Sequence, residues 1–181
     1  LKVLKAWDRT ADIKNMNAAL SFKVFYYIYN NTNGQMEKQF ATDKKAKFEF
    51  FVKAIQEVKK DMLANFGTLT VPLGDYQRHQ RGDVDLPIDG GADLWDAKYG
   101  NPYTKGRIRV WLGESFILLA KFTKDGPKFR TISPYGTSNK PGSKHYTDQM
   151  QLYVNHQTKE ESLDKKWAYD HAERIYTPEM K

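Results

Sequence analysis

The stretch DKKAKFEFFVKAIQEVKKDMLAN, residues 43–65, predicts an amphipathic helix. Its apolar residues recur at intervals of three and four, which places them on one side of a helix. This stripe consists of Phe50, Phe51, Ala54, Ile55, Val58, Met62 and Phe66. Thr42 or Asp43 can cap the start, and Gly67 can end the helix in the left-handed conformation. We expect the stripe to pack in a hydrophobic core.

A second helix is predicted before this one, between Ile13 and Tyr29. Its apolar residues near helical spacing are Met16, Leu20, Val24, Phe25, Tyr27 and Ile28. The polar run NNTNG at 30–34 ends the pattern, because asparagine and glycine tolerate the left-handed conformation common at helix ends. Residues 1–67 therefore predict two antiparallel helices.

Residues 68–112 differ in composition from the helical part, with glycine, proline and aspartate at short intervals. Examples are LGD at 73–75, RGD at 81–83 and LPIDGG at 86–91. Glycine, proline and aspartate at such intervals predict turns. A loop this long inside a domain is usually functional or covers another surface. We expect one long irregular segment that crosses a neighbouring surface.

Residues 113–134 predict a β-hairpin, because KDGP at 124–127 is a strong turn signal. Residues 135–181 predict a loop followed by helices. The expected elements are strands at Ser115–Phe122 and Lys128–Ser133 and helices at His145–Asn155 and Leu163–Arg174. We treat residues 1–181 as a single region of the α+β class.

Composition excludes several classes of protein. The chain has 181 residues, of which 40% are apolar and 14% aromatic, so it is not a disordered tail. It has no cysteine, which excludes disulfides, thiolate metal sites and a cysteine nucleophile. No apolar run approaches the roughly 18 residues of a membrane span, so we predict none. The formal net charge of +7 favours weak attraction to anions.

Two sets of residues have side chains that can bind metals, but neither set has the spacing of a known metal site. An acidic series lacks the glutamate at the twelfth position of a calcium loop, which falls on Ala97. The histidines stand far apart, without the spacing of zinc ligands. The sets are Asp83, Asp85, Asp89, Asp93 and Asp96, and His79, His145, His156 and His171. We predict no metal and no cofactor, with the acids as turn formers and caps.

Motifs for covalent catalysis and nucleotide binding are also missing. GESF at 113–116 lacks the second glycine of a nucleophile elbow, so Ser115 is not predicted to be a nucleophile. Basic and aromatic residues alternate at 76–81 and 105–111, as in binders of single-stranded nucleic acid. The acidic run at 83–96 separates them, and no nucleic-acid motif matches. We predict no nucleic-acid partner.

Several strings of the sequence resemble one enzyme family. They are LKAWD at 4–8, GDYQRHQRGD at 74–83, LPIDGG at 86–91, GESF at 113–116 and PYGTSNKPGSKHYTDQ at 134–149. In this order they are similar to the C-terminal part of the β subunit of penicillin acylase family enzymes, which include acyl-homoserine lactone acylases. The string at 134–149 is the most specific of them.

The resemblance implies an N-terminal nucleophile hydrolase of αββα fold, exported as a precursor to the periplasm or secreted, and cut into α and β subunits. Such enzymes hydrolyse an amide bond between an acyl chain and an amine. The first residue of the β subunit, usually serine, is the nucleophile, and its α-amino group is the base. Some members hold a structural calcium, whose ligands are not identifiable in this sequence.

This sequence departs from that pattern at its first residue. Leu1 carries no nucleophilic atom, and the opening residues read like the inside of a longer protein. We expect a piece cut from a precursor, whose partners are the remaining α and β segments. No catalytic, cofactor-binding or metal-binding residue is assigned to it, and its substrate-binding residues are unknown. Six residues are interpreted as hydrogen-bonding residues that fix loops: Arg78, Arg81, His145, Tyr146, Asp148 and Gln149.

Two functions follow as alternatives. In the first, the chain is the scaffold part of an acylase whose small substrate is a penicillin, an acyl-homoserine lactone or a similar acyl amide. In the second, it is a stand-alone, non-enzymatic binding module for anionic surfaces. The many aromatic residues on both helices further predict a large exposed apolar patch on the isolated chain.

Overall fold

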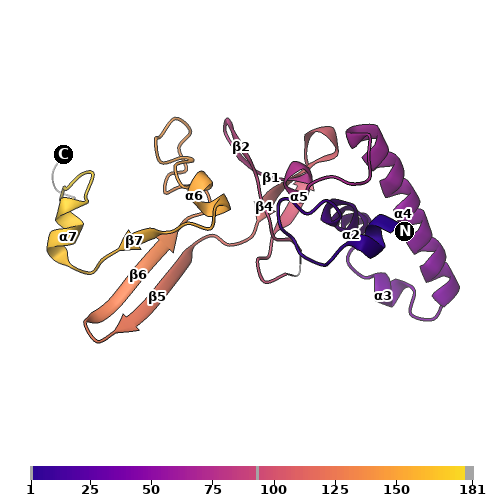
Figure 1. Cartoon of the computed structure of the whole chain (residues 1–181), viewed down its shortest axis with the longest axis horizontal. Coiled ribbons are helices and arrows are strands. Elements are labelled where there is room, and N and C mark those ends of the chain that lie inside the picture. Colours follow the sequence, from indigo (N-terminus) through magenta and orange to yellow (C-terminus); the bar gives the residue numbers. More distant parts are fainter. Residues whose placement is uncertain (1, 93, 178–181) are drawn as a thin grey trace. The chain divides into compact units, whose positions relative to one another are not determined.

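The computed structural model describes residues 2–92 and 94–177. Leu1, which was excluded above as a nucleophile, and Asp93 of the acidic series lie outside this range. The chain divides into two compact units, Leu1–Glu114 and Ser115–Lys181. Each unit is described by itself (Figure 1).

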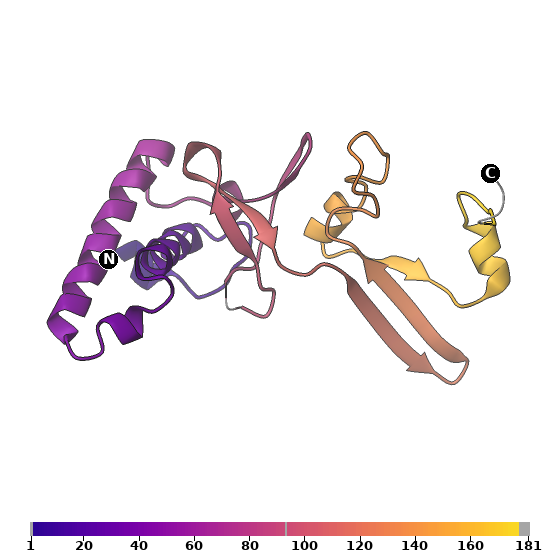
Figure 2. The ribbon, with the colours of Figure 1, turned by 180° about the vertical axis from the view of Figure 1, so that it is seen from behind.

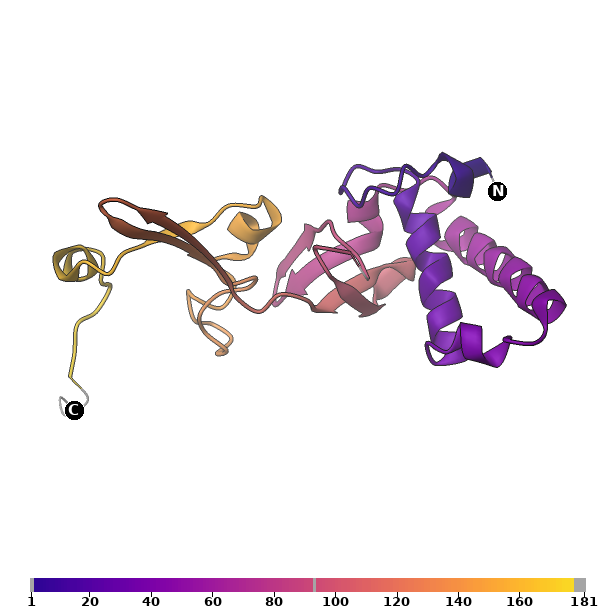
Figure 3. The same ribbon diagram turned by 90° about the horizontal axis from the view of Figure 1, so that it is seen from below.

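The first unit begins with a helical layer. Its helices are α1 (Lys2–Ala6), α2 (Ala18–Thr32), α3 (Met36–Gln39) and α4 (Lys44–Phe66). Helices α2 and α4 lie side by side and are joined through α3 (Figure 3). Asp43 caps α4 by accepting a hydrogen bond from the Ala46 amide at 2.8 Å, and Gly67 ends it with φ of 70°. Both long helices and the caps of α4 are therefore confirmed.

Helix α2 begins later than the predicted Ile13. The chain before it is held in turns, where the Asp12 carboxylate accepts from the Lys14 amide at 2.7 Å. The Asn15 side chain donates to Asp8 at 2.8 Å and to the Thr10 hydroxyl at 2.7 Å. The bond of Asp12 to a nearby backbone amide competes with helix formation, and the bonds of Asn15 hold the turn that precedes the helix.

A four-stranded sheet follows, where the sequence predicted a long irregular segment. Helix α5 (Leu73–Tyr76) leads into β1 (Gln77–Arg81), β2 (Val84–Pro87) and β3 (Tyr99–Pro102), and a short 3-10 helix η1 (Thr104–Gly106) precedes β4 (Ile108–Leu112). The strand order is β2-β1-β4-β3, with β1 and β4 parallel and the other pairs antiparallel.

The prediction of a continuous loop over 68–112 is wrong for these strands. They are four or five residues long, and β1 reads QRHQR, with Gln77 and His79 on its buried face. A strand that buries polar side chains shows no hydrophobic alternation, which is the usual signal. Within the described part of the segment, residues 88–98 contain no named helix or strand.

The core of the first unit lies between α2, α4 and the start of the sheet. Its buried residues are Ala18, Ala19, Leu20, Phe22, Val24, Val58, Met62, Val71, Leu73, Tyr76 and Ile108. Of the predicted stripe on α4, Ala54, Val58 and Met62 are buried, whereas Phe51 is 38% exposed. The stripe thus enters the core through its middle and C-terminal part.

The second unit is a three-stranded antiparallel sheet with small helices. It contains β5 (Ile117–Thr123), β6 (Gly126–Ile132), α6 (Met150–Val154), β7 (Lys159–Glu161) and α7 (Lys165–Asp170). The strand order is β5-β6-β7, and β7 runs along only part of β6 (Figure 2). The predicted hairpin is confirmed, and so is the mixed α+β class.

Two details of the second unit differ from the prediction. The helix expected from His145 begins at Met150, because residues 143–149 form turns closed by the bonds from the Tyr146 amide to Ser143 and from the Met150 amide to Thr147. Strand β7 was missed, since its sequence KEE has no apolar residue. No helix within the described ranges is long and apolar enough to cross a membrane.

Candidate functional site

The string at 134–149 folds into a loop held by its own side chains. The Gln149 side chain accepts a hydrogen bond from the Ser133 amide at 3.0 Å, and its backbone amide donates to the Tyr135 carbonyl at 3.0 Å. The Ser138 amide donates to the His145 carbonyl at 3.0 Å. Because both ends of the loop are tied together, we call residues 133–149 the motif loop.

Gly136 is the point of closest approach inside the motif loop. A Cβ atom at this position would lie 2.3 Å from the His145 carbonyl oxygen and 2.6 Å from an Asp148 carboxylate oxygen. Both distances are shorter than any normal contact. The glycine is therefore required by packing, which explains its place in the most specific string of the sequence.

We expect Gly136→Ala to open the motif loop. The new methyl group displaces the His145 carbonyl, and overpacking of this kind costs about 1–3 kcal/mol. Amide hydrogen exchange of residues 133–149 measures the loss of protection. Gly142→Ala is the control, since nothing lies within 4 Å of that position and only its positive φ opposes the change. Equal loss of protection in both variants would contradict the steric argument.

His145 joins the motif loop to the C-terminal segment. Its Nδ1 lies 2.7 Å from an Asp148 carboxylate oxygen, and its Nε2 lies 2.7 Å from Glu173. Lys144 forms an ion pair with the same glutamate. The hydrogen bond with Asp148, and then the one with Glu173, raises the pKa of His145. Bonds to Lys144 and His145 lower the pKa of Glu173.

This arrangement favours a charged imidazolium over a catalytic base. A general base must be neutral to take a proton, and here two carboxylates stabilise the protonated ring. Both ring nitrogens are already engaged, so neither faces a hydroxyl that it could activate. His145 is suited to fixing the loop, as the sequence predicted.

The attachment of the C-terminal segment should depend on pH. Because the pKa of folded His145 is raised, the contribution of its two bonds is complete below the ordinary histidine pKa of about 6.5. It is lost as the pH rises through the raised value. We expect amide exchange of residues 165–175 to accelerate at alkaline pH beyond its intrinsic increase.

Substitution of Glu173 tests this linkage directly. Glu173→Gln removes a carboxylate and should lower the pKa of His145 in an NMR titration. Asp170→Asn is the control, because Asp170 pairs with Lys166 at 2.5 Å rather than with the histidine. An unchanged His145 titration in Glu173→Gln would refute the role of this contact.

The first unit has its own polar centre behind β1. The buried Gln77 side chain donates from Nε2 to the carbonyls of Ile88 at 3.3 Å, Asp89 at 2.9 Å and Gly90 at 3.0 Å. These bonds hold the irregular residues 88–90 against the strand. Nothing in a single glutamine indicates such a role in the sequence, although it lies in the GDYQRHQRGD string.

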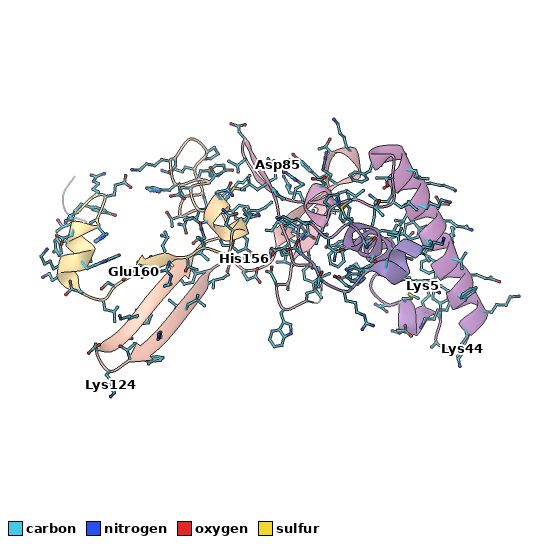
Figure 4. All side chains as sticks on the ribbon, viewed as in Figure 1. Lys5, Lys44, Asp85, Lys124, His156 and Glu160 are labelled. Carbon is cyan, nitrogen blue, oxygen red and sulfur yellow. The ribbon has the colours of Figure 1, made fainter. Side chains whose placement is uncertain are left out.

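Three members of the acidic series, Asp85, Asp89 and Asp96, form ion pairs. Lys98 is only 2% exposed, and its ammonium lies beside Asp96 and 3.7 Å from Asp89. Asp85, at the β1–β2 hairpin (Figure 4), pairs with Arg78, and the two side chains are 2.7 Å apart according to their atoms Oδ1 and Nε. Within residues 2–92 and 94–177, no three metal-ligating side chains lie close enough to hold an ion. The structure brings these acids to basic partners instead of to one another.

Three arginines in the basic and aromatic stretches at 76–81 and 105–111 also have partners, and they are Arg78, Arg107 and Arg109. Arg78 donates to the Gly74 carbonyl at 2.6 Å, as expected of a loop-fixing residue. Arg107 donates to the Asp75 carbonyl at 2.8 Å, and Arg109 donates to the Gln80 side chain at 3.3 Å. Such contacts connect neighbouring strands and loops, so these guanidinium groups are not arranged as a stacking platform.

A hollow of about 420 Å³ opens between α2, α4 and residues 102–108. Lys23 stands in it, 2.5 Å from Asp61 and 2.6 Å from the Gly106 carbonyl, with its ammonium 5.3 Å from the centre of the Tyr76 ring. Burial raises the pKa of Tyr76 well above its usual value, so its phenol stays protonated. The hollow thus contains a paired lysine, which no pattern in the sequence predicted.

A sequence model of the family described as penicillin amidase matches residues 1–167. This chain belongs to the penicillin amidase family. The family resemblance deduced from the five strings is therefore confirmed. The match includes all five strings that carried the resemblance, from residue 4 to residue 149.

Two curated relatives of this penicillin amidase family chain carry the same name. Over 90 residues it is 27% identical to acyl-homoserine lactone acylase PvdQ of Pseudomonas fluorescens. The aligned residues are 48% of this chain and 12% of that protein. Over 71 residues it is 30% identical to the protein of the same name from Pseudomonas putida, covering 38% of this chain and 9% of the relative. The matched part is a small share of either protein.

One solved structure matches over most of this chain, at low similarity. Thermostable penicillin G acylase from Alcaligenes faecalis matches with a TM-score of 0.43 and 13% sequence identity. The match covers 97% of this chain and 41% of the acylase chain. The family assignment rests on the sequence match over residues 1–167.

Proposed function

We propose that this chain is the scaffold part of an acylase that hydrolyses the amide bond of an acylated amine. The observation that carries the proposal is the penicillin amidase family match over residues 1–167. The nucleophile and the oxyanion-stabilising groups belong to polypeptide beyond these 181 residues. The substrate is an acyl-homoserine lactone, a penicillin or a similar acyl amide.

The geometry of the described polar residues supports a scaffold role. His145 is placed between two carboxylates, Gln77 binds three carbonyls, and Lys98 is paired with aspartates. His145 reaches Glu173, 28 residues away, and Gln77 reaches residues 88–90, which lie 11 to 13 residues away. A catalytic site needs a nucleophile within reach of a base, and His145 has both nitrogens engaged elsewhere.

The remaining α and β segments of the same acylase are the proposed partners. The two curated relatives are named acyl-homoserine lactone acylase, and each is matched over a small share of its length. An enzyme of this kind is made as a precursor and exported, so we place it in the periplasm or outside the cell. Degradation of a signalling lactone or of an antibiotic is the corresponding biological role.

Hydrolysis assays on two proteins test this function. The complete gene product that contains this sequence, and residues 1–181 alone, are incubated with a chromogenic acyl amide, an acyl-homoserine lactone series and penicillin G. We expect the complete protein to release acid and amine in equal amounts and the isolated chain to release none. Hydrolysis by the isolated chain would refute the scaffold role.

The same two proteins also test the alternative, a stand-alone module that binds anionic surfaces. A complete gene product that cleaves no acyl amide, together with salt-sensitive binding of the isolated chain to heparin, would support a module for anionic surfaces. That result would overturn the acylase proposal.

A further inference from the structure

The β5–β6 hairpin presents an unpaired sheet edge. Strand β5 pairs with β6 along its whole length and is the outer strand of the order β5-β6-β7. Within the described part of the chain, no strand pairs with its other side. An exposed strand of seven residues, ILLAKFT, is a template for another strand, and native proteins cover or blunt such edges.

One face of this hairpin is apolar. The register pairs Leu118 with Thr131, Ala120 with Phe129 and Phe122 with Pro127, and residues that alternate along a strand share a face. On this face Leu118 is 53% and Phe122 is 83% exposed. Large apolar side chains that gather on one exposed face mark an interaction surface.

The opposite face carries three basic residues, Lys121, Lys128 and Arg130, and one acidic residue, Glu160 of β7, which lies across from Arg130. Lys121 lies directly across from Lys128, and Leu119 lies across from Arg130. Like charges in opposite positions of an antiparallel pair destabilise it. Residues 115–133 carry four basic side chains and one acidic one. An acidic partner on this face would remove the repulsion between the two lysines.

A second copy of the chain does not suit this edge. In a symmetric antiparallel pairing of two β5 strands centred on Ala120, Lys121 of each copy lies opposite Leu119 of the other. Both Lys121–Lys128 pairs would then lie on one face of a single sheet. The repulsion within each hairpin would remain, because the second copy brings no acidic side chain next to Lys121.

We propose that β5 and the apolar face of the hairpin are the docking surface for a strand from the rest of the acylase. This strand adds to the free edge, carries acidic side chains towards Lys121 and Lys128, and places apolar side chains beside Phe122. The inference rests on the proposed function, since it takes its partner from the same enzyme. The low coverage of the relatives supports it, because most of their length lies outside the matched region.

Zero-length cross-linking in the complete gene product tests whether acidic side chains of the partner strand contact Lys121 and Lys128. A carbodiimide joins a lysine to a carboxylate only when the two are in contact. We expect cross-links from Lys121 or Lys128 to an aspartate or glutamate outside residues 1–181. Lys124 at the tip of the hairpin is the matched control and should give at least fivefold fewer (Figure 4). Cross-links only within this chain, or to a second copy of it, would overturn the proposal.

Amide exchange and one substitution test the edge itself. In the complete protein, the amides of residues 117–123 should all be protected, whereas an edge strand protects only those facing β6. Phe122→Asp should lower the yield of assembled protein at least tenfold, and Lys124→Asp should leave it within twofold. If alternate β5 amides exchange freely while the protein hydrolyses an acyl amide, this docking is refuted and the acylase function stands.

Discussion

Met62→Ala is expected to lower the free energy of unfolding of the first unit by about 3–5 kcal/mol. Met62 is fully buried in α4 and belongs to the core cluster formed with α2 and Tyr76. Truncation removes the transfer free energy of the side chain and leaves a cavity, because a densely packed core relaxes only in part. Urea unfolding followed by amide exchange of residues 18–32 measures the change.

Leu63→Ala is the matched control for this prediction. Leu63 is the next residue of the same helix and is 44% exposed. Its truncation changes the same helix turn and a similar volume, yet we expect a loss below about 1 kcal/mol, as for most surface substitutions. Equal losses in the two variants would show that α4 does not pack on α2 through Met62.

Local signals in the sequence were enough to predict the helices. Asp43 and Gly67 mark both ends of α4, and the spacing of Ala54, Val58 and Met62 gives its buried face. The hairpin was predicted in the same way, since the Asp125-Gly126 turn joins two strongly β-forming runs. These elements are determined by residues within one turn or one strand of each other.

The four-stranded sheet could not be predicted by such signals. Strand β1 pairs in parallel with β4, about thirty residues later, at Gln77–Ile108 and Arg78–Arg109. Pairing over that distance depends on packing against α2 and α4, which no local pattern reports. The buried Gln77 further hides the strand from any method that expects apolar residues inside.

The sequence predicted several of the polar residues that fix loops, but it did not predict all of their partners. His145, Asp148 and Gln149 were expected to fix loops, and the structure places their bonds within the motif loop and to Glu173. Glu173 lies 28 residues from His145 and was not predicted as a partner. Ion pairs between distant segments have no spacing rule, so they appear only in the folded chain.

The residues that identify the family are therefore not residues that carry out a reaction. The strings that identify the family contain Gly136, Gln77 and His145, and all three have structural roles in close packing or hydrogen bonding. A motif can be specific for a family without containing a reacting group, because a demanding backbone arrangement restricts sequence as strongly as catalysis does.

Gln77→Leu should destabilise the first unit by about 2–4 kcal/mol. Its amide donates to the carbonyls of Ile88, Asp89 and Gly90, and leucine of similar volume cannot replace those bonds. A buried acceptor without a donor costs about 1–3 kcal/mol, and more than one carbonyl is affected here. We expect residues 88–92 to lose amide protection first, because this glutamine holds them against β1.

Gln80→Leu provides the control on the same strand. Gln80 donates to the Gly82 carbonyl at 2.7 Å in an exposed position, where water can take over the bond. The same substitution should therefore cost less than about 1 kcal/mol. If Gln77→Leu were as mild as Gln80→Leu in urea unfolding, the loop at 88–90 would be held by the ion pair between Asp89 and Lys98, and its position would not depend on Gln77.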